Sequence, residues 1–339
     1  MESLGWYYFC ACITLLVGFE LGLANGQYYR QVGSRKLPYQ TFTVDQSGHG
    51  NFSTVQSAID AVPSNNKYWI CIRVKAGTYR EKVIVPYDKQ YIILKGEGRR
   101  KTWIEWNDHD NVAQSATFYS QADNFVAKSI SFRNTYNIDP VNKNPRAPAV
   151  AAMISGDKSA FYRCGFYGLQ DTLWDVQGRH YYNKCTVQGA IDFIFGAGQT
   201  IFENCSIAYS GEYIEPGVLG YITAQGRLGP YDSNGFVFKG CSVHGTGSTY
   251  LGRPWRAYSR VIFYNSNFSH VVNPTGWDAW NYVSSEQRLT YVEHNCFGSG
   301  AADSSQRVSW SKKLSQADLN EFIRITFIDN EGWLDDQPL

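Results

Sequence analysis

Two aspartates lie inside apolar runs bounded by glycine, which is an unusual place for a charged side chain. Asp171 lies in GLQDTLWDV, residues 168–176, and Asp192 lies in GAIDFIFGAG, residues 189–198. Their sequence numbers differ by 21, as do those of Cys164 and Cys185. A carboxylate among apolar residues needs a partner that offsets the cost of removing it from water. The equal spacing indicates that both pairs follow one structural repeat.

The spacing predicts two carboxyl groups with different protonation states. If the cysteines stack on neighbouring strands, the aspartates do so too, about 4.8 Å apart. Two carboxylates at this distance repel, so one keeps its proton near neutral pH while the other is ionised. Such a pair is suited to supply a general acid and a nucleophile.

Arg253, in the segment YLGRPW, is the expected partner of Asp192. A guanidinium against Asp192 keeps that carboxylate charged, whereas Asp171, which lacks a cation, retains its proton. An ordinary structural ion pair is the alternative interpretation.

Aromatic residues make up 16% of the chain, and several lie in or near these segments. They include Trp174, Phe195, Trp255, Trp277 and Trp280. Because flat aromatic rings are suitable platforms for the faces of sugar rings, the sequence favours a carbohydrate substrate.

Other kinds of site lack support in the sequence. There is no GxSxG motif of a serine hydrolase, no HExxH motif and no close group of Cys and His residues. GEG at 96–98 and GAG at 196–198 lack the third glycine of a dinucleotide loop. The 31 basic and 30 acidic residues balance, so no strong field draws the chain to nucleic acid. We expect neither a metal nor a cofactor.

A short pattern recurs along the chain: an apolar or aromatic pair, a polar residue, Asn or Cys, and further residues that favour strands. The residues taken as equivalent are Asn134, Cys164, Cys185, Cys205, Cys241 and Asn267. The sequence numbers of successive members differ by 30, 21, 20, 36 and 26. One such unit cannot bury its own apolar face, but successive units can do so by stacking. The repeat predicts an all-β solenoid, a parallel β-helix, with a β-sandwich as the alternative.

Helical periodicity is sparse. The best helix candidates are residues 54–61 and 315–323, one near each end, where a solenoid needs to be capped.

Residues 1–26 have the pattern of a signal peptide. Residues 6–17 are apolar, and Ala24-Asn25-Gly26 forms a small-residue cleavage site. Residues 27–40 then form an N-terminal extension, and residues 41–339 form the β-helix domain. No later segment has the apolar length of a membrane span. We therefore expect a secreted, extracellular protein without membrane attachment after cleavage.

Export bears on the cysteines and on surface asparagines. Cys164 and Cys185 are the pair best placed for a disulfide, although buried free thiols remain the alternative. Asn51, Asn204 and Asn267 each begin a glycosylation sequon.

The chain resembles the plant-type pectinesterases, or pectin methylesterases, from about residue 41 to residue 334. The resemblance rests on four segments in order: GTYRE at 77–81, GLQDTL at 168–173, DFIFG at 192–196 and LGRPW at 251–255. It implies a right-handed parallel β-helix, with short terminal helices here, and an aspartyl esterase that acts on methyl-esterified galacturonan. Export and this substrate imply a location in the cell wall.

The same resemblance implies roles for individual residues. Asp192 matches the nucleophile, and Asp171 matches the acid that protonates methanol and then the base that activates water. Gln170 matches the donor to the oxyanion, and Arg253 positions Asp192 and the substrate. The matching substrate-binding positions are Thr117, Phe195, Arg253 and Trp255.

Pro148 departs from the family pattern, which has glutamine at this place. Proline offers neither a side-chain donor nor a backbone N–H. A second amide contact is therefore missing, unless Asn142, Asn144 or Arg146 reaches in. This departure leaves a weakly active or non-catalytic pectin-binding protein as one alternative.

A second alternative is a glycosidase on the same solenoid, because paired carboxylates about 5 Å apart also suit retaining glycosidases. The expected partner is methyl-esterified pectin, and a proteinaceous pectinesterase inhibitor is a further candidate. We expect a monomer.

Overall fold

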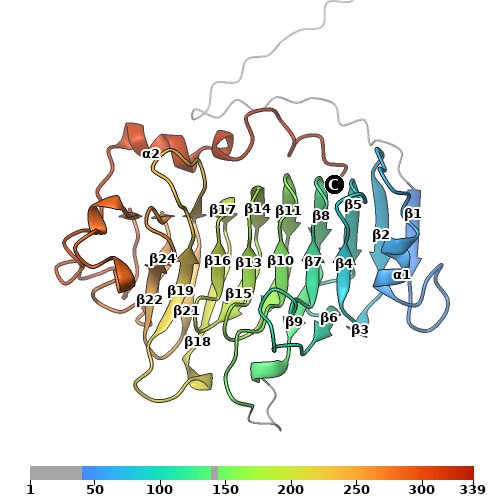
Figure 1. Cartoon of the computed structure of the whole chain (residues 1–339), viewed down its shortest axis with the longest axis horizontal. Coiled ribbons are helices and arrows are strands. Elements are labelled where there is room, and N and C mark those ends of the chain that lie inside the picture. Colours follow the sequence, from blue (N-terminus) through green and yellow to red (C-terminus); the bar gives the residue numbers. More distant parts are fainter. Residues whose placement is uncertain (1–39, 139–143) are drawn as a thin grey trace, which may run out of the picture. The chain divides into compact units, whose positions relative to one another are not determined.

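The structure is a computed structural model that describes residues 40–138 and 144–339. The expected signal peptide and all of the expected extension except Gln40 lie outside the described residues, so these boundaries remain predictions. In the described part the chain coils through three sheets, A, B and C, in which every strand pair is parallel (Figure 1).

Sheet A is the longest, and its strands are β1 (Gln40–Val44), β2 (Ile70–Val74), β5 (Ile92–Gly96), β8 (Phe125–Lys128), β11 (Ser159–Tyr162), β14 (Arg179–Asn183), β17 (Gln199–Glu203), β20 (Gly235–Lys239), β23 (Arg260–Tyr264) and β25 (Thr290–His294). Sheet B contains β3 (Gly77–Arg80), β6 (Thr102–Trp106), β9 (Ser131–Asn134), β12 (Gly165–Tyr167), β15 (Thr186–Gly189), β18 (Ser206–Ser210), β21 (Ser242–Thr246) and β24 (Asn267–Phe268). Sheet C contains β4 (Val83–Val85), β7 (Phe118–Ser120), β10 (Ala152–Ile154), β13 (Leu173–Asp175), β16 (Ile194–Gly196), β19 (Gly220–Gln225) and β22 (Thr249–Pro254).

From β2 to β22, each coil contributes one strand to each sheet, in the order A, B, C, and each strand pairs with its counterpart on the next coil. This arrangement is a parallel β-helix, which confirms the predicted fold class. The β-sandwich alternative is wrong, because a sandwich consists of antiparallel sheets.

The repeated sequence pattern has a structural cause in the turn between sheets A and B. The residue before each cysteine takes left-handed backbone angles, with φ of 54° at Arg163, 55° at Lys184, 54° at Asn204 and 60° at Gly240. Asn and Gly adopt this conformation readily. Two residues earlier, an aromatic side chain points into the coil. The resulting ladder is Phe161, Tyr182, Phe202, Phe238 and Phe263, with successive ring centroids 4.4 to 4.8 Å apart.

The two outermost equivalences in the predicted repeat are wrong. Strand register places Ile130, not Asn134, level with Cys164, and Ser266, not Asn267, level with Cys241. The sequence numbers of these true equivalents differ by 34 and 25, where the predicted repeat had 30 and 26. The assignment failed because Asn also occurs within the neighbouring strands, whereas the turn position itself accepts several residue types.

The predicted disulfide between Cys164 and Cys185 is also wrong, because both are buried free thiols. The Cys164 N–H donates to the Cys185 sulfur at 3.4 Å, and the Cys185 thiol donates to the Phe161 carbonyl at 3.3 Å. Residues in register on parallel coils point the same way, about 4.8 Å apart. A disulfide requires the two Cβ atoms to be about 3.5 to 4.5 Å apart.

Both predicted helices are confirmed, each with the expected N-cap. Helix α1 (Val55–Asp60) begins after Thr54, and α2 (Gln316–Ile323) begins after Ser315; each cap oxygen accepts from a backbone N–H three residues later at 3.2 Å. The 3-10 turns are η1 (Tyr136–Ile138), η2 (Gly211–Tyr213), η3 (Trp280–Tyr282), η4 (Glu286–Arg288) and η5 (Ile325–Phe327).

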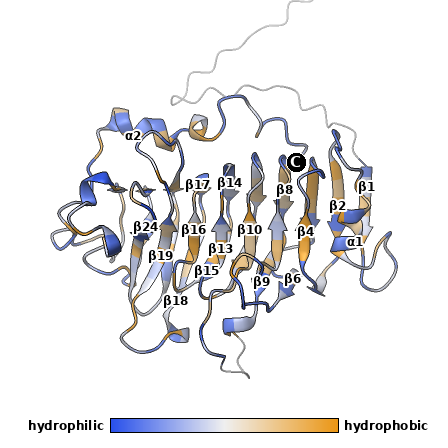
Figure 2. Cartoon of the chain, in the orientation of Figure 1, coloured by the Kyte–Doolittle hydropathy of each residue, from blue (hydrophilic) through white to orange (hydrophobic). Residues whose placement is uncertain are grey.

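Helix α2 and the segment that follows it cover the outer face of sheet A. Leu319, Phe327, Ile328 and Trp333 join the apolar residues on that face, and this segment runs across the strands in Figure 1. Hydrophobic residues concentrate in strands such as β4 and β10, whereas α2 is largely hydrophilic (Figure 2).

Two further observations concern membrane-spanning helices and the sequon asparagines. No helix within residues 40–138 and 144–339 is long and apolar enough to cross a membrane. The three sequon asparagines, Asn51, Asn204 and Asn267, are all exposed, and their glycosylation remains a prediction.

Candidate active site

Asp171 and Asp192 lie in register on adjacent coils, immediately before strands β13 and β16. Leu173 pairs with Ile194, and Gln170 bridges to Ile191, so the two aspartates are level with each other. The Asp171 N–H also donates to the Ile191 carbonyl at 3.0 Å. The expected stacking of the two acids is therefore what the structure shows.

Both aspartates take left-handed backbone angles, with φ of 62° at Asp171 and 48° at Asp192. Aspartate tolerates this region better than most residues. The glycine that opens each run makes the turn possible. A Cβ at Gly189 would lie 2.3 Å from the Phe193 Cβ, so the chain closes on itself around Asp192.

Arg253, from strand β22, donates two hydrogen bonds to the carboxylate of Asp192. Its Nε donates to Oδ1 at 2.8 Å and its Nη2 donates to Oδ2 at 2.6 Å. Only 17% of the Arg253 side chain and 15% of the Asp192 side chain are exposed. Two parallel charge-assisted bonds fix the orientation of a carboxylate as well as its charge. The expected partnership is present in the structure.

The electrostatics of the two aspartates differ. Burial and the neighbouring Asp192 carboxylate raise the pKa of Asp171 to about 8. Burial also raises the pKa of Asp192, but the Arg253 guanidinium opposes that shift through its hydrogen bonds and its charge. Near neutral pH, Asp171 therefore holds a proton and Asp192 is the ionised member of the pair.

Gln170 precedes Asp171 and is half-buried. Its carbonyl accepts from the Ala149 N–H at 3.2 Å, which ties it to the preceding coil. Its side-chain amide makes no hydrogen bond within the described part of the chain. This donor is thus free to meet a ligand beside the two carboxyl groups.

An apolar row crosses the outer face of sheet C beside the pair. The residues in register are Tyr119, Met153, Trp174, Phe195, Ala224 and Arg253. The Trp174 and Phe195 rings stack with centroids 5.0 Å apart, and Trp255 meets Phe195 edge-on at 5.7 Å. Phe195 is only 5% exposed, whereas both tryptophans are partly exposed. Trp174 and Trp255 are therefore the aromatic rings of this row that a ligand can reach from solvent.

The expected contact between Thr117 and a substrate stays a prediction. Thr117 is fully buried, and its hydroxyl donates to the Arg133 carbonyl at 3.1 Å. Thr117 precedes β7, and the coil register places it level with Ala151 and Thr172, which are fully buried too.

Pro148 lies half-buried just before Ala149, the residue in register with Gln170. The candidate substitutes for its missing amide are engaged elsewhere. Arg146 forms a salt bridge with Glu215, and the Asn144 amide donates to the Tyr136 carbonyl at 2.9 Å. The remaining candidate, Asn142, lies outside the described residues.

Tyr221, Asp278 and Trp280 surround Arg253, and sequence reasoning missed the first two. The Arg253 Cζ lies 4.0 Å from the centroid of the Tyr221 ring and 4.5 Å from that of Trp280. Sequence spacing gave no signal for Tyr221, because its coil carries a long insertion. Strand register identifies it, since it lies level with Asp192 on the next coil.

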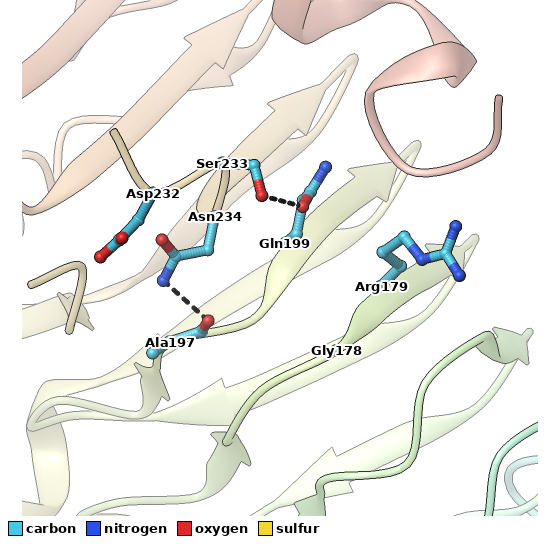
Figure 3. Close-up of a pocket in the computed structure, with 7 residues that line it drawn as sticks. All are labelled: Gly178, Arg179, Ala197, Gln199, Asp232, Ser233 and Asn234. Atoms are coloured by element: carbon cyan, nitrogen blue, oxygen red, sulfur yellow. Dashed lines mark hydrogen bonds between the residues drawn. The ribbon is translucent and has the colours of Figure 1, made fainter. Parts of the chain in front are cut away.

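A separate pocket of about 360 Å³ lies where the strands of sheet C end (Figure 3). It is lined by Gly178, Arg179, Ala197, Gln199, Asp232, Ser233 and Asn234. Most of its polar groups already have partners: Ser233 donates to Gln199 at 2.7 Å, and Arg179 pairs with Asp157 and Glu331. The Asn234 side-chain oxygen has none within the described residues. We therefore place the active site at the aspartate pair. In residues 40–138 and 144–339, no group of three His, Cys, Asp or Glu side chains is arranged to hold a metal ion.

Comparisons with known proteins agree with this geometry. The Pectinesterase family model matches residues 41–331. Probable pectinesterase 29 of Arabidopsis thaliana is 59% identical over 303 residues, which cover 88% of this chain and 90% of that protein.

Two solved structures show the same fold. The pectin methylesterase from carrot superposes with a TM-score of 0.82 at 33% identity, covering 92% of this chain and 98% of the other. The pectin methylesterase from Aspergillus niger gives a TM-score of 0.74 at 30% identity, covering 88% and 96%. The chain therefore belongs to the pectinesterase family, and it is a carboxylic-ester hydrolase.

Proposed function

We propose that the chain removes methyl esters from homogalacturonan and that Asp192 is its nucleophile. The observation that carries the proposal is the asymmetry of the stacked pair. Arg253 donates two hydrogen bonds to Asp192, while Asp171 beside it makes no salt bridge within the described residues. The guanidinium keeps one carboxyl charged, and burial keeps the other protonated.

In the first half-reaction, an oxygen of the Asp192 carboxylate attacks the carbonyl carbon of the methyl ester. The side-chain amide of Gln170 donates to the oxyanion that forms; the loss of one such donor commonly raises the barrier by about 3 kcal/mol. The tetrahedral intermediate collapses with cleavage of the bond to the methoxy oxygen. Asp171 gives its proton to that oxygen, so methanol leaves and an acyl group remains on Asp192.

In the second half-reaction, Asp171 is a carboxylate and takes a proton from water. The resulting hydroxide attacks the acyl carbon, and the bond to Asp192 breaks. The products are a galacturonic acid group and the ionised Asp192, while Asp171 holds its proton again. The new acid then releases its own proton to water and becomes the galacturonate carboxylate. Arg253 keeps the Asp192 side chain in one orientation for both half-reactions.

The substrate is proposed to lie along the apolar row of sheet C. Trp174 and Trp255 supply partly exposed aromatic faces next to the acids, and successive strands repeat about every 4.8 Å along the coil axis. Pectin, a chain of sugar rings, can stack its faces on these aromatic rings.

Several finer properties belong to the proposal as well. We infer that residues 1–26 are a signal peptide, that the protein acts in the cell wall and that it is a monomer. The exposed sequon asparagines Asn51, Asn204 and Asn267 are suitable glycan acceptors. A proteinaceous inhibitor is proposed as a partner. Mass spectrometry of the exported protein and its mass in solution test these points.

The glycosidase and non-catalytic alternatives are not favoured. The family match and the relatives support ester hydrolysis. New reducing ends without methanol would instead support glycosidase chemistry, and pectin binding without turnover would support a binding protein.

The direct test is methanol release from methyl-esterified pectin by the purified protein. We expect release by the wild type and almost none by Asp192→Ala. The matched control is Asp335→Ala, which removes an exposed carboxylate near the C-terminus and is expected to leave the rate unchanged. Undiminished release by Asp192→Ala would remove the proposed nucleophile.

A further inference from the structure

The guanidinium of Arg253 is held from two sides besides its bonds to Asp192. It lies over the ring of Tyr221, from β19, and over the ring of Trp280, from η3. Cation–π contacts at these distances restrict where a guanidinium can move. The two rings therefore limit the freedom of a side chain that otherwise has many rotamers.

One carboxylate, that of Asp278, holds both rings. The Tyr221 hydroxyl donates to Asp278 Oδ2 at 2.8 Å, and the Trp280 backbone N–H donates to Asp278 Oδ1 at 2.8 Å. Asp278 itself is placed by the coil register, because Gly252 bridges to Trp277 and the Asp278 N–H donates to the Gly252 carbonyl at 3.2 Å. Asp278 thus lies level with Arg253, one coil further on.

The conformation of Trp280 indicates that it needs this support. Its φ is 45°, a left-handed angle that is rare for a large side chain, and 40% of the residue is exposed. Surrounding contacts must stabilise such a backbone. The hydrogen bond from its N–H to Asp278 closes the turn that presents the indole to Arg253.

We propose that Asp278 is a positioning residue which, through Tyr221 and Trp280, holds Arg253 in the orientation that directs the Asp192 carboxylate. The proposal rests on the proposed function, since it deepens the account of the same site. Asp278 does not touch the reacting atoms; it acts only through the two rings and the guanidinium.

Two modes of action for Asp278 predict opposite shifts of the acid limb of the pH–rate profile. The charged or titratable groups around Asp192 and Arg253 are Asp171, Tyr221, Asp278 and Tyr291. If Asp278 acted only by its negative charge, its removal would lower the pKa of Asp192. If it positions Arg253, its removal loosens the two bonds to Asp192, and the pKa of Asp192 rises.

The experiment compares Asp278→Asn and Tyr221→Phe with the wild type. Tyr221→Phe keeps the ring and changes no charge at neutral pH, so it isolates the positioning effect. We expect each variant to lower kcat/KM about tenfold and to move the acid limb to higher pH. The double variant should lose little more than either single variant, because both break the same link.

Tyr250→Phe is the matched control. Tyr250 stacks on Tyr221 with centroids 5.3 Å apart, and the Tyr250 hydroxyl makes no hydrogen bond within the described residues. The pH–rate profile of Tyr250→Phe should therefore equal that of the wild type. An acid limb that stays in place or moves to lower pH in Asp278→Asn, or an unchanged Tyr221→Phe, would overturn the proposal.

A second measurement separates this proposal from the proposed function. A raised pKa of Asp192 in the folded state removes stability as the pH rises through it. Asp278→Asn should therefore lose more thermal stability between pH 4 and pH 7 than the wild type. This measurement needs no turnover, so it tests the positioning of Arg253 by Asp278 even if the protein releases no methanol. An equal or smaller loss than in the wild type would contradict positioning.

Discussion

Asp171 and Asp192 lie in register on adjacent coils, yet within the described residues only Asp192 forms a salt bridge, with the guanidinium of Arg253. Backbone hydrogen bonds between the coils fix the two residues side by side, and Arg253 reaches Asp192 with two bonds of 2.8 and 2.6 Å. The stacking of coils brings the two carboxyl groups together. Arg253, on strand β22 two coils after Asp192, makes their charges differ. Separate parts of the fold therefore set the distance between the acids and the difference in their charge.

Replacement of Arg253 by lysine tests whether the paired geometry matters beyond the charge. Lysine keeps a cation but cannot donate two parallel bonds to one carboxylate. We expect Arg253→Lys to lower kcat/KM by about 10- to 100-fold, and Arg253→Met to lower it further. The Met variant also leaves Asp192 buried without a partner, which destabilises the protein by about 3–5 kcal/mol. Equal activity of the wild type and the Lys variant would show that charge alone suffices.

The pH dependence of methanol release follows from the two pKa shifts. The first step needs a protonated Asp171, whose pKa is raised to about 8, so kcat/KM should fall as the pH rises through about 8. It also needs an ionised Asp192, so activity should fall on the acid side as this carboxyl gains a proton.

Asp171→Asn supplies the matching control, because asparagine can neither give nor take the proton. Its residual rate should be about 100- to 10,000-fold lower and show no alkaline limb. A profile identical in shape to that of the wild type would contradict the role of Asp171.

The same substitution should stabilise the folded protein at alkaline pH. The raised pKa of Asp171 means that ionisation is easier in the unfolded chain, so stability present at low pH is lost as the pH rises toward about 8. Asp171→Asn removes this loss. We expect its Tm at pH 8 to exceed that of the wild type by several degrees, at roughly 2–4 °C per kcal/mol, with a smaller gain at pH 4. A Tm below that of the wild type at both values would rule out this linkage.

Much of the fold could be predicted because its signals are local and repeated. The aromatic residue, the turn residue and the buried cysteine recur in each short coil, and the caps Thr54 and Ser315 mark both helices. The outer members of the repeat were misassigned because insertions conceal the register. The burial of Thr117 could not be predicted because the strand it precedes has only three residues, too few to reveal which face is buried.

The acid pair of the site was predictable because it has the same sequence interval as Cys164 and Cys185. The surroundings of Arg253 were not, since Tyr221 comes from a coil with a long insertion and Asp278 from a segment beyond the last strand of sheet C. Only the register of the folded coils brings Tyr221 level with Asp192 and Asp278 level with Arg253.

The buried thiols predict insensitivity to reducing agents. Cys164 and Cys185 are unpaired, so dithiothreitol should leave the Tm of the exported protein unchanged within about 1 °C. A disulfide that closed this loop would contribute about 3 kcal/mol, and its reduction would lower the Tm clearly. A large fall in Tm on reduction would show that a disulfide is present after all, in contradiction to the free thiols of the structure.

Pro148→Gln tests whether the departure from the family pattern limits the rate. Pro148 lies next to the residue in register with Gln170, so an amide at this position is placed to donate beside the Gln170 amide. We expect Pro148→Gln to raise kcat for methanol release about tenfold, because one more donor stabilises the oxyanion. Pro148→Ala is the matched control, since it removes the ring and restores the backbone N–H, as the Gln variant does, but adds no side-chain donor. If both variants gain equally, the benefit comes from the backbone, through its freedom or its restored N–H, and not from the side-chain amide; if neither gains, the site needs no second amide.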